Sequence, residues 1–232
     1  DKERHRYEIE EFYMKSGQEV HGYFSKLFSE KVATQFCDAI MEVSDKCEDS
    51  SYIDSVEIRF PKFNIEAEED YNEFIDWKKS QTFNGEVRLD HAFLRFRCVK
   101  SFKRMYGHLD KIKKGEYKQR VIDEIKVLEM HNFCSYMLIV SDFIQKAREQ
   151  NIRVGPGRGS VGGCLVANLL GIHEVDPIKY GLLFERFHNK EKKSFPDIDT
   201  DIGSDGRDWV VKYVVEKYGK ENVACISNLA RM

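Results

Sequence analysis

The sequence has no run of apolar residues near the roughly 18 that cross a membrane, and no secretory signal peptide opens it. Its six cysteines form no CxxC pair, and no histidine stands at zinc-finger spacing from them. Internal repeats and Gly/Ser linkers are absent too. We therefore expect no membrane partner, no structural zinc site, and reduced thiols in a cytoplasmic protein.

A strong net charge is also missing, since 37 basic and 40 acidic residues leave the 232-residue chain at −3. This average hides two biased stretches: residues 38–76 hold 13 acidic and 3 basic side chains, and residues 97–126 hold 10 basic and 4 acidic ones. The hydrophobic share of 41% is that of a globular protein with one sizeable core or two modest ones. A nucleic-acid or phosphate-bearing partner therefore fits one face only.

The spacing of apolar residues predicts a helix-rich chain with a few short strands. Asn151 is expected to break one helix, and Gly171 and Gly219 are expected to end two others. The predicted helices cover 30–48, 67–77, 83–105, 117–130, 135–150, 164–170 and 207–218, and the predicted strands cover 53–60, 152–154 and 195–202.

Three aspartates alternate with apolar residues in the run Pro196-Asp-Ile-Asp-Thr-Asp-Ile202. In a strand Asp197, Asp199 and Asp201 share one face, because successive side chains point to opposite sides. Like charges in a row repel one another unless protons or cations intervene. Divalent metals meet that need, and two ions held by such carboxylates can activate an attacking oxygen and stabilise a leaving one.

Two other interpretations of the aspartate run remain. An acidic strand on a solvated edge needs no ligand at all. A calcium loop would place Asp197, Asp199, Asp201, Asp205 and Asp208 at positions 1, 3, 5, 9 and 12. That loop needs glycine at position 6, where this chain has isoleucine, and glutamate at position 12, where it has aspartate.

A glycine-rich segment, Gly155-Pro-Gly-Arg-Gly-Ser-Val-Gly-Gly163, precedes the aspartates by some forty residues. Glycines let backbone amides approach a ligand closely, and Arg158 offers a fork of donors suited to phosphate. Ser160 is expected to cap the helix that follows and to aim its positive end at the same place. The segment therefore predicts an anion-binding turn, although a turn that merely starts a helix would look similar.

The same glycines also match a dinucleotide-binding fingerprint, GxGxxG, from Gly157 to Gly162. That fingerprint requires a strand before it and a helix after it within a βαβ unit, whereas a long helix and three extended residues precede it here. A Walker loop is excluded because no Gly-Lys-Ser/Thr follows. Basic residues lie between the two motifs: Arg186 is a candidate charge stabiliser, while Lys190, Lys192 and Lys193, like the segment 117–120, are more typical of a solvated face.

The order of these motifs resembles the palm of the replicative C-family DNA polymerases of bacteria and phages. The resemblance rests on Val154–Ser160, Leu182–Phe187 and Pro196–Ile202, with weaker matches at 137–140, 207 and 215–219. Upstream, Glu11–Ser16 is similar to the segment that closes the family's N-terminal PHP (polymerase and histidinol phosphatase) domain.

The resemblance implies roles for individual residues. Asp199 and Asp201 match the palm carboxylates that hold two Mg²⁺ ions, while Asp197 matches a neighbour that is not counted as catalytic. Gly159 and Ser160 match the Gly-Ser signature at the incoming triphosphate, with Arg158 beside it and Arg186 nearby. The implied reaction is template-directed transfer of a nucleotide from a dNTP to a primer 3′-hydroxyl. Primer–template DNA, the dNTP and, through other parts of the protein, a sliding clamp and further replisome subunits are the implied partners.

The resemblance also implies a fold class and a division of the chain. The fold class is α+β, a helix-rich N-terminal part followed by a partial nucleotidyltransferase-like palm. We expect residues 1–60 to be the tail of a PHP-like domain, 61–116 a helical connector, 117–206 part of the palm and 207–232 the start of the thumb. The family's third catalytic aspartate lies beyond Met232, so we expect an excerpt of a longer polymerase that is inactive alone.

This sequence departs from the family at two places. Val161-Gly-Gly-Cys164 stands where small residues and a serine are usual, and Ser227–Met232 replaces a Thr-Phe-Gly-Thr-Met run. These departures suggest a divergent, phage-like member working in a bacterial or host cytoplasm. Two alternatives stay open: a non-catalytic nucleic-acid-binding module with palm architecture, which would bind DNA through residues 97–126, and a dinucleotide-binding enzyme.

Overall fold

The computed structural model describes residues 13–48, 61–83, 85–192 and 194–224, which form two separate compact units. The first consists of residues 13–48, and the second of the described residues from 61 onward. The predicted strand at 53–60 and the run after residue 224 lie outside the described residues.

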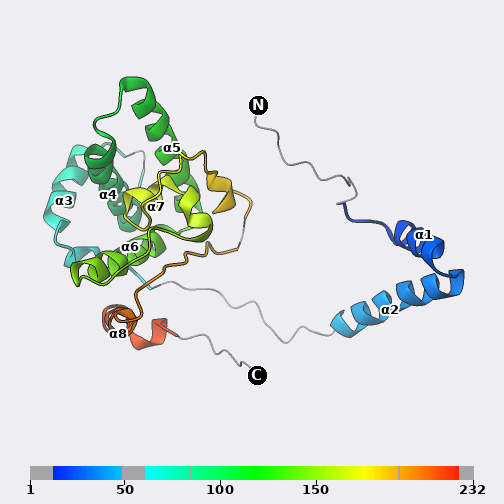
Figure 1. The fold of residues 1–232 in the computed structure, drawn as a ribbon. Coiled ribbons are helices and arrows are strands. Elements are labelled where there is room, and N and C mark those ends of the chain that lie inside the picture. The colour runs from blue at the N-terminus through cyan, green and yellow to red at the C-terminus, as the bar shows by residue number, and fades with distance from the viewer. Residues whose placement is uncertain (1–12, 49–60, 84, 193, 225–232) are drawn as a thin grey trace. The chain divides into compact units, whose positions relative to one another are not determined.

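The first unit is a pair of packed helices, α1 (Gly17–Leu27) and α2 (Glu30–Glu48), drawn in blue in Figure 1. Phe24 and Phe36 join them, with ring centroids 5.3 Å apart. The side chain of Ser16 accepts a hydrogen bond from the Glu19 N–H while the Glu19 carboxylate accepts one from the Ser16 N–H, a capping box that starts α1. The spacing of apolar residues predicts α2 with its observed bounds, whereas α1 is absent from the predicted helices.

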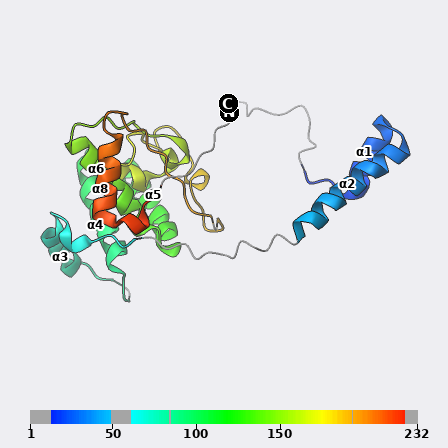
Figure 2. The same ribbon diagram turned by 90° about the horizontal axis from the view of Figure 1, so that it is seen from below.

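The second unit is built around a short buried helix. All five residues of α7 are buried, and α7 contacts both α4 and α5, while α4 also packs on α6. Figures 1 and 2 show α8 beside α6. The elements are η1 (Ile65–Ala67), α3 (Tyr71–Ser80), α4 (Leu89–Tyr106), α5 (Lys111–Met130), α6 (Cys134–Glu149), η2 (Gly159–Gly163), α7 (Leu165–Leu169), η3 (Phe184–Arg186), α8 (Arg207–Tyr218) and η4 (Lys220–Asn222), where η marks a 3₁₀ helix.

Three helices end at a residue with a left-handed backbone conformation, and two of these ends were predicted from the sequence. Asn132, Asn151 and Gly171 follow α5, α6 and α7 with φ of 59°, 57° and 73°, the left-handed conformation that closes a helix. At Gly171 the helix closes in a Schellman motif, in which the N–H of Ile172 donates to the carbonyl of Ala167 at 2.9 Å. The predicted ends at Asn151 and Gly171 are confirmed.

Three helices begin several residues away from where the spacing of apolar residues predicts. The α3 helix starts at residue 71 rather than 67, α4 at 89 rather than 83, and α5 at 111 rather than 117. The side chain of Asp110 accepts hydrogen bonds from the N–H groups of Ile112 and Lys113, both at 3.0 Å, and this cap adds a first turn to α5.

The predicted α+β character is not confirmed: the described part of the chain is mostly helical. Its β pairing is one isolated antiparallel bridge, between Val154 and Ile202. Residues 195–202 are extended but do not form the predicted strand, because only residues 153–155 provide neighbouring backbone groups, and a strand needs a ladder of such bonds. The helix-rich character that the sequence predicts is confirmed.

Three thiols lie inside the second unit. Cys98, Cys134 and Cys164 are buried, and burial raises the pKa of each thiol well above its usual value. The protonated thiols of Cys98 and Cys134 therefore act as small apolar groups of the core, whereas Cys164 also makes hydrogen bonds through its sulfur. Among the described residues, none of the helices combines the length and the hydrophobicity that crossing a bilayer requires.

His188 is also fully buried, and neither of its ring nitrogens has a hydrogen-bond partner among the described residues. Burial lowers its pKa from 6.5 to about 4. Because the unfolded chain binds this proton first, stability is complete above pH 6.5 and falls as the pH drops towards 4, by up to about 3 kcal/mol from this group.

We expect the variant His188→Phe, which keeps a flat ring but cannot bind a proton, to weaken that pH dependence. The measurement is the free energy of urea unfolding between pH 7 and 4. The exposed His108→Gln serves as the control and should keep the wild-type slope. An unchanged slope in His188→Phe would contradict the assignment.

Candidate functional site

The aspartate run lies in an extended conformation with its carboxylates in solvent. Asp197, Asp199 and Asp201 are exposed, whereas Ile198 and Ile202 between and beyond them are partly buried. This alternation agrees with the shared acidic face that the sequence predicts. The backbone is fixed at one end, where the Gly155 N–H donates to the Asp201 carbonyl at 2.8 Å and the Gly203 N–H donates to the Arg153 carbonyl at 2.9 Å.

The glycine-rich segment lies directly against two of the aspartates. A Cβ added to Gly159 would lie 3.1 Å from Oδ2 of Asp199, and one added to Gly155 would lie 3.0 Å from Cβ of Asp201. Gly159 also has a φ of 71°, which side chains rarely adopt. Glycine is therefore favoured where the turn approaches the carboxylates, most clearly at Gly159. The two motifs, some forty residues apart in the sequence, lie side by side.

Arg158 connects the two motifs electrostatically. Its Nη1 lies 3.2 Å from Oδ1 of Asp201, and the two side chains are 63% and 60% exposed. An ion pair this exposed contributes little to stability because water and salt screen it. The guanidinium can therefore exchange its carboxylate partner for another anion at small cost.

The prediction that Ser160 caps a helix is wrong. Ser160 lies inside η2, and α7 begins later, with Cys164 as its cap residue, whose Sγ accepts from the Ala167 N–H. The buried carboxylate of Glu124 accepts from the Val166 N–H at 2.8 Å, so this helix start needs no serine. Ser160 is instead exposed beside Gly159, and α7 is too short to give the turn a helix-dipole charge.

Arg186 reaches the neighbourhood of the turn through packing between two 3₁₀ helices. It is exposed at the end of η3, which packs against η2. At the junction a Cβ on Gly163 would collide with the Leu183 carbonyl oxygen. The segment that ends in Arg186 therefore packs against the 3₁₀ helix that contains Gly159 and Ser160, while a role for Arg186 at the turn stays a prediction.

The donor set suits a hard cation in part. Asp199 and Asp201 offer carboxylate oxygens, the ligands that Mg²⁺ takes from proteins, one or two at a time alongside substrate phosphates. Among the described residues, no group of three or more His, Cys, Asp or Glu side chains is arranged to hold a metal ion. The pair therefore fits an ion that the substrate helps to coordinate, but not a cage made by this chain alone.

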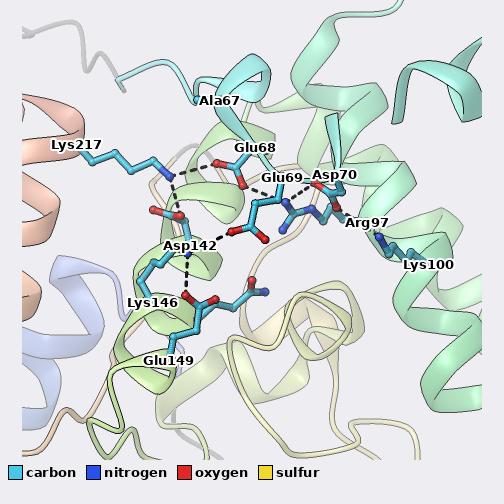
Figure 3. Close-up of a pocket in the computed structure, with 11 residues that line it drawn as sticks. Ala67, Glu68, Glu69, Asp70, Arg97, Lys100, Asp142, Lys146, Glu149 and Lys217 are labelled. Atoms are coloured by element: carbon cyan, nitrogen blue, oxygen red, sulfur yellow. Dashed lines mark hydrogen bonds and ion pairs between the residues drawn. The ribbon is translucent and has the colours of Figure 1, made fainter. Parts of the chain in front are cut away.

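Sequence reasoning missed a charged cluster that holds α8. Asp142 is buried on α6 and accepts hydrogen bonds from Lys217 Nζ at 2.8 Å and from the Tyr218 hydroxyl at 2.7 Å. Lys217 also pairs with Glu68, which pairs with Arg97. The four charged side chains of this cluster line a cavity of about 280 Å³, as Figure 3 shows for Glu68, Arg97, Asp142 and Lys217. Since α8 begins six residues after Asp201, this cluster anchors the chain that leaves the site.

Burial disfavours the charge of Lys217, but the hydrogen bond and charge of Asp142 outweigh burial and raise the pKa of Lys217. The lysine therefore stays charged at neutral pH. Acidic residues at 68–70 were read from the sequence as part of a surface helix, and no pattern in the sequence pairs them with residues 142 and 217.

The dinucleotide alternative loses its structural basis. The residues before Gly155 form an antiparallel bridge instead of a parallel strand, and the glycines lead into η2 rather than into a regular helix. Neither half of the βαβ context is present in the described part of the chain.

Comparison with known proteins agrees with the motif order. Residues 92–232 match the family model of the bacterial DNA polymerase III alpha NTPase domain. The whole chain is 37% identical to DNA polymerase III subunit alpha of Helicobacter pylori, of which it covers 18%, and 36% identical to that of Campylobacter jejuni, of which it covers 19%. Over 111 residues, 48% of the chain, it is 54% identical to DNA polymerase III subunit alpha of Aquifex aeolicus, of which it covers 10%.

The chain thus spans about a fifth of the length of the first two relatives. The glycine turn and the aspartate run lie within the residues that match the family model and within those that match the Helicobacter pylori protein. The chain therefore belongs to the bacterial DNA polymerase III alpha family.

Proposed function

We propose that this chain supplies two of the metal-binding carboxylates and the triphosphate-binding turn of a DNA-directed DNA polymerase. The approach of Gly159 to Asp199 is the observation that carries this proposal, because it unites an anion-binding turn with a cation-binding pair. The relatives bear the name DNA polymerase III subunit alpha, and the same site serves template-directed nucleotidyl transfer in this proposal.

Each residue has a role in the proposed reaction. Asp199 and Asp201 hold Mg²⁺, which when bound supplies positive charge for the phosphates and for the attacking and leaving oxygens. Arg158 and Arg186 donate to the triphosphate, and Gly159 and Ser160 present an uncrowded N–H and a hydroxyl to it. The primer 3′-oxygen bonds to the α-phosphorus of the dNTP, the bond to the β-phosphate oxygen breaks, and pyrophosphate and a proton are released.

The proposal also divides the chain into domains and names its substrates and partners. Residues 1–60 would end a PHP-like domain, 61–116 would form the connector, 117–206 part of the palm and 207–232 the start of the thumb. Primer–template DNA and dNTP are the proposed substrates, and a sliding clamp and other replisome subunits the proposed partners of the longer protein. We expect no polymerase activity from these residues alone, since the described part brings only two carboxylates to the turn.

The proposed triphosphate-binding role of Arg158 is tested by measuring the KM for dNTP separately from kcat. In the full-length alpha subunit that contains this chain, we expect Arg158→Ala to raise the KM for dNTP about ten- to a hundredfold, the usual cost of losing one charged donor to phosphate. Steady-state primer extension over a range of dNTP concentrations measures it. The control is Arg153→Ala, an exposed arginine just before the turn, which should keep the wild-type KM. A wild-type KM in Arg158→Ala would contradict the assignment.

The alternative of a non-catalytic DNA-binding module has less support. Several cations of residues 97–126 are already paired: Arg97 with Glu68 and Asp70, Lys100 with Glu73, and Arg120 with Glu124. Lys103 and Lys118 have no ion-pair partner among the described residues and line an apolar groove between α4 and α5. Salt-dependent DNA binding that needs these two lysines and no divalent cation would favour the alternative.

A further inference from the structure

One face of α5 carries polar side chains that bind the chain segments around the candidate site. Tyr117, Arg120 and Glu124 recur at helical spacing, so they line one side of the helix. The Tyr117 hydroxyl donates to Oδ2 of Asp176 at 2.8 Å, and Oδ1 of Asp176 accepts from the N–H groups of Ile178 and Lys179. We call these three α5 side chains the polar seam.

Arg120 binds two separate segments of the site with one guanidinium. Its Nη2 donates to the Gly163 carbonyl at 2.9 Å and to the Leu182 carbonyl at 3.2 Å. Gly163 ends η2, and Leu182 comes two residues before η3. This one nitrogen therefore joins the end of the turn that contains Gly159 to the segment that leads to Arg186.

Glu124 completes the arrangement from a fully buried position. Its side chain is 1% exposed, its Oε1 accepts from Nε of Arg120 at 2.6 Å, and its Oε2 accepts from the Val166 N–H at 2.8 Å. Burial raises the pKa of Glu124, and the bonds from Arg120 and Val166 oppose that rise. A buried ion pair is a poor way to gain stability compared with apolar packing. We therefore explain the Arg120–Glu124 pair by the backbone groups that it binds, at residues 163, 166 and 182.

We propose that Arg120 and Glu124 are positioning residues for triphosphate binding, which set the separation of the glycine turn and Arg186. The inference rests on the proposed function, because it assigns these residues to the same site. Neither side chain touches the substrate: each acts through the backbone of residues 163–166 and 182. Their loss should loosen η2 and η3 and weaken dNTP binding more than it slows turnover.

The chain offers a matched control pair. Arg95 on α4 and Glu129 on α5 form a two-bond ion pair, with Nε–Oε1 at 2.6 Å and Nη2–Oε2 at 2.7 Å. Both this pair and the Arg120–Glu124 pair contain a partly exposed arginine and a shielded glutamate. In the described part of the chain, neither Arg95 nor Glu129 makes a side-chain hydrogen bond to residues 155–186.

The experiment compares Arg120→Gln, Glu124→Gln and Arg95→Gln in the full-length alpha subunit that contains this chain. For the first two variants we expect the KM for dNTP to rise about tenfold, with kcat within about twofold of wild type. The KM of Arg120→Lys should lie between those of the wild type and Arg120→Gln, because one ammonium cannot reproduce the guanidinium that binds both carbonyls and Glu124. For Arg95→Gln we expect a wild-type KM.

Amide hydrogen exchange in the same variants gives a readout that does not depend on catalysis. Exchange should accelerate in residues 159–163 and 182–186 in Arg120→Gln, and in neither segment in Arg95→Gln. A wild-type KM and wild-type exchange in both Arg120→Gln and Glu124→Gln would overturn the inference. If Arg120→Gln does not fold, Glu124→Gln and Arg120→Lys decide by the same criteria. Primer extension that survives loss of Asp199 and Asp201 would instead refute the proposed function.

Discussion

Primer extension is expected to fall at least about a thousandfold when Asp199 or Asp201 is replaced by asparagine in the full-length alpha subunit that contains this chain. Asparagine keeps the size and one oxygen of the side chain but removes the negative charge. The two carboxylates are exposed next to Gly159 and Gly155, so the substitution should not disturb the core. The loss should therefore appear in kcat and in the response to Mg²⁺ or Mn²⁺, not in stability.

Asp197→Asn is the matched control for these variants. Asp197 is exposed in the same extended run and on the same side, but neither turn glycine lies against it. We expect its activity to stay within about tenfold of wild type, since a nearby charge acts only through screened electrostatics. Undiminished primer extension in both Asp199→Asn and Asp201→Asn would end the proposal that this site is catalytic.

Asp142→Ala is expected to lower the free energy of unfolding by roughly 3 to 5 kcal/mol, the usual cost of removing one partner from a buried ion pair. The substitution leaves Lys217 with Glu68 alone and leaves the Tyr218 hydroxyl without its acceptor. The α8 helix should detach first, because these bonds join it to α6. Urea unfolding monitored by far-UV circular dichroism measures the effect.

The control for this variant lies on the same helix. Glu149 is exposed and pairs with Lys146, three residues away, at 2.7 Å. Glu149→Ala should therefore change the free energy of unfolding by no more than about 0.5 kcal/mol. If the two variants cost the same, the Asp142 cluster does not anchor α8.

Local signals account for the helices that the sequence predicts correctly. The bounds of α2 and α8 follow from apolar spacing, and the ends of α6 and α7 follow from Asn151 and Gly171. The helix α1 was missed although Ser16 and Glu19 form the S-x-x-E capping signature. The apolar residues of α1 also recur at helical spacing, i, i+3, i+4 and i+7 (Val20, Tyr23, Phe24 and Leu27). Both the cap and the spacing therefore indicated this helix, and both were overlooked.

The candidate site was predictable as a set of residues, not as an arrangement. Alternation placed the carboxylates of the aspartate run on one exposed side, and the glycines marked a close approach. The partner of that approach, Asp199, lies forty residues away and cannot be read from local pattern. The Ser160 cap failed for a similar reason: the acceptor at the start of α7 comes from Glu124 on another helix. Long-range contacts of this kind depend on packing that spacing does not encode.

The three buried thiols of the second unit allow its local opening to be measured by chemical modification. A reagent reacts with a thiolate, and the raised pKa values of Cys98, Cys134 and Cys164 together with their burial block that reaction while the helices stay closed. Cys164 directly follows the glycine turn in the sequence, so its alkylation rate measures how often that region opens. The alkylation rate of Cys98 measures the opening of α4 in the same way. A nucleotide that closes the turn would slow the first rate and leave the second unchanged.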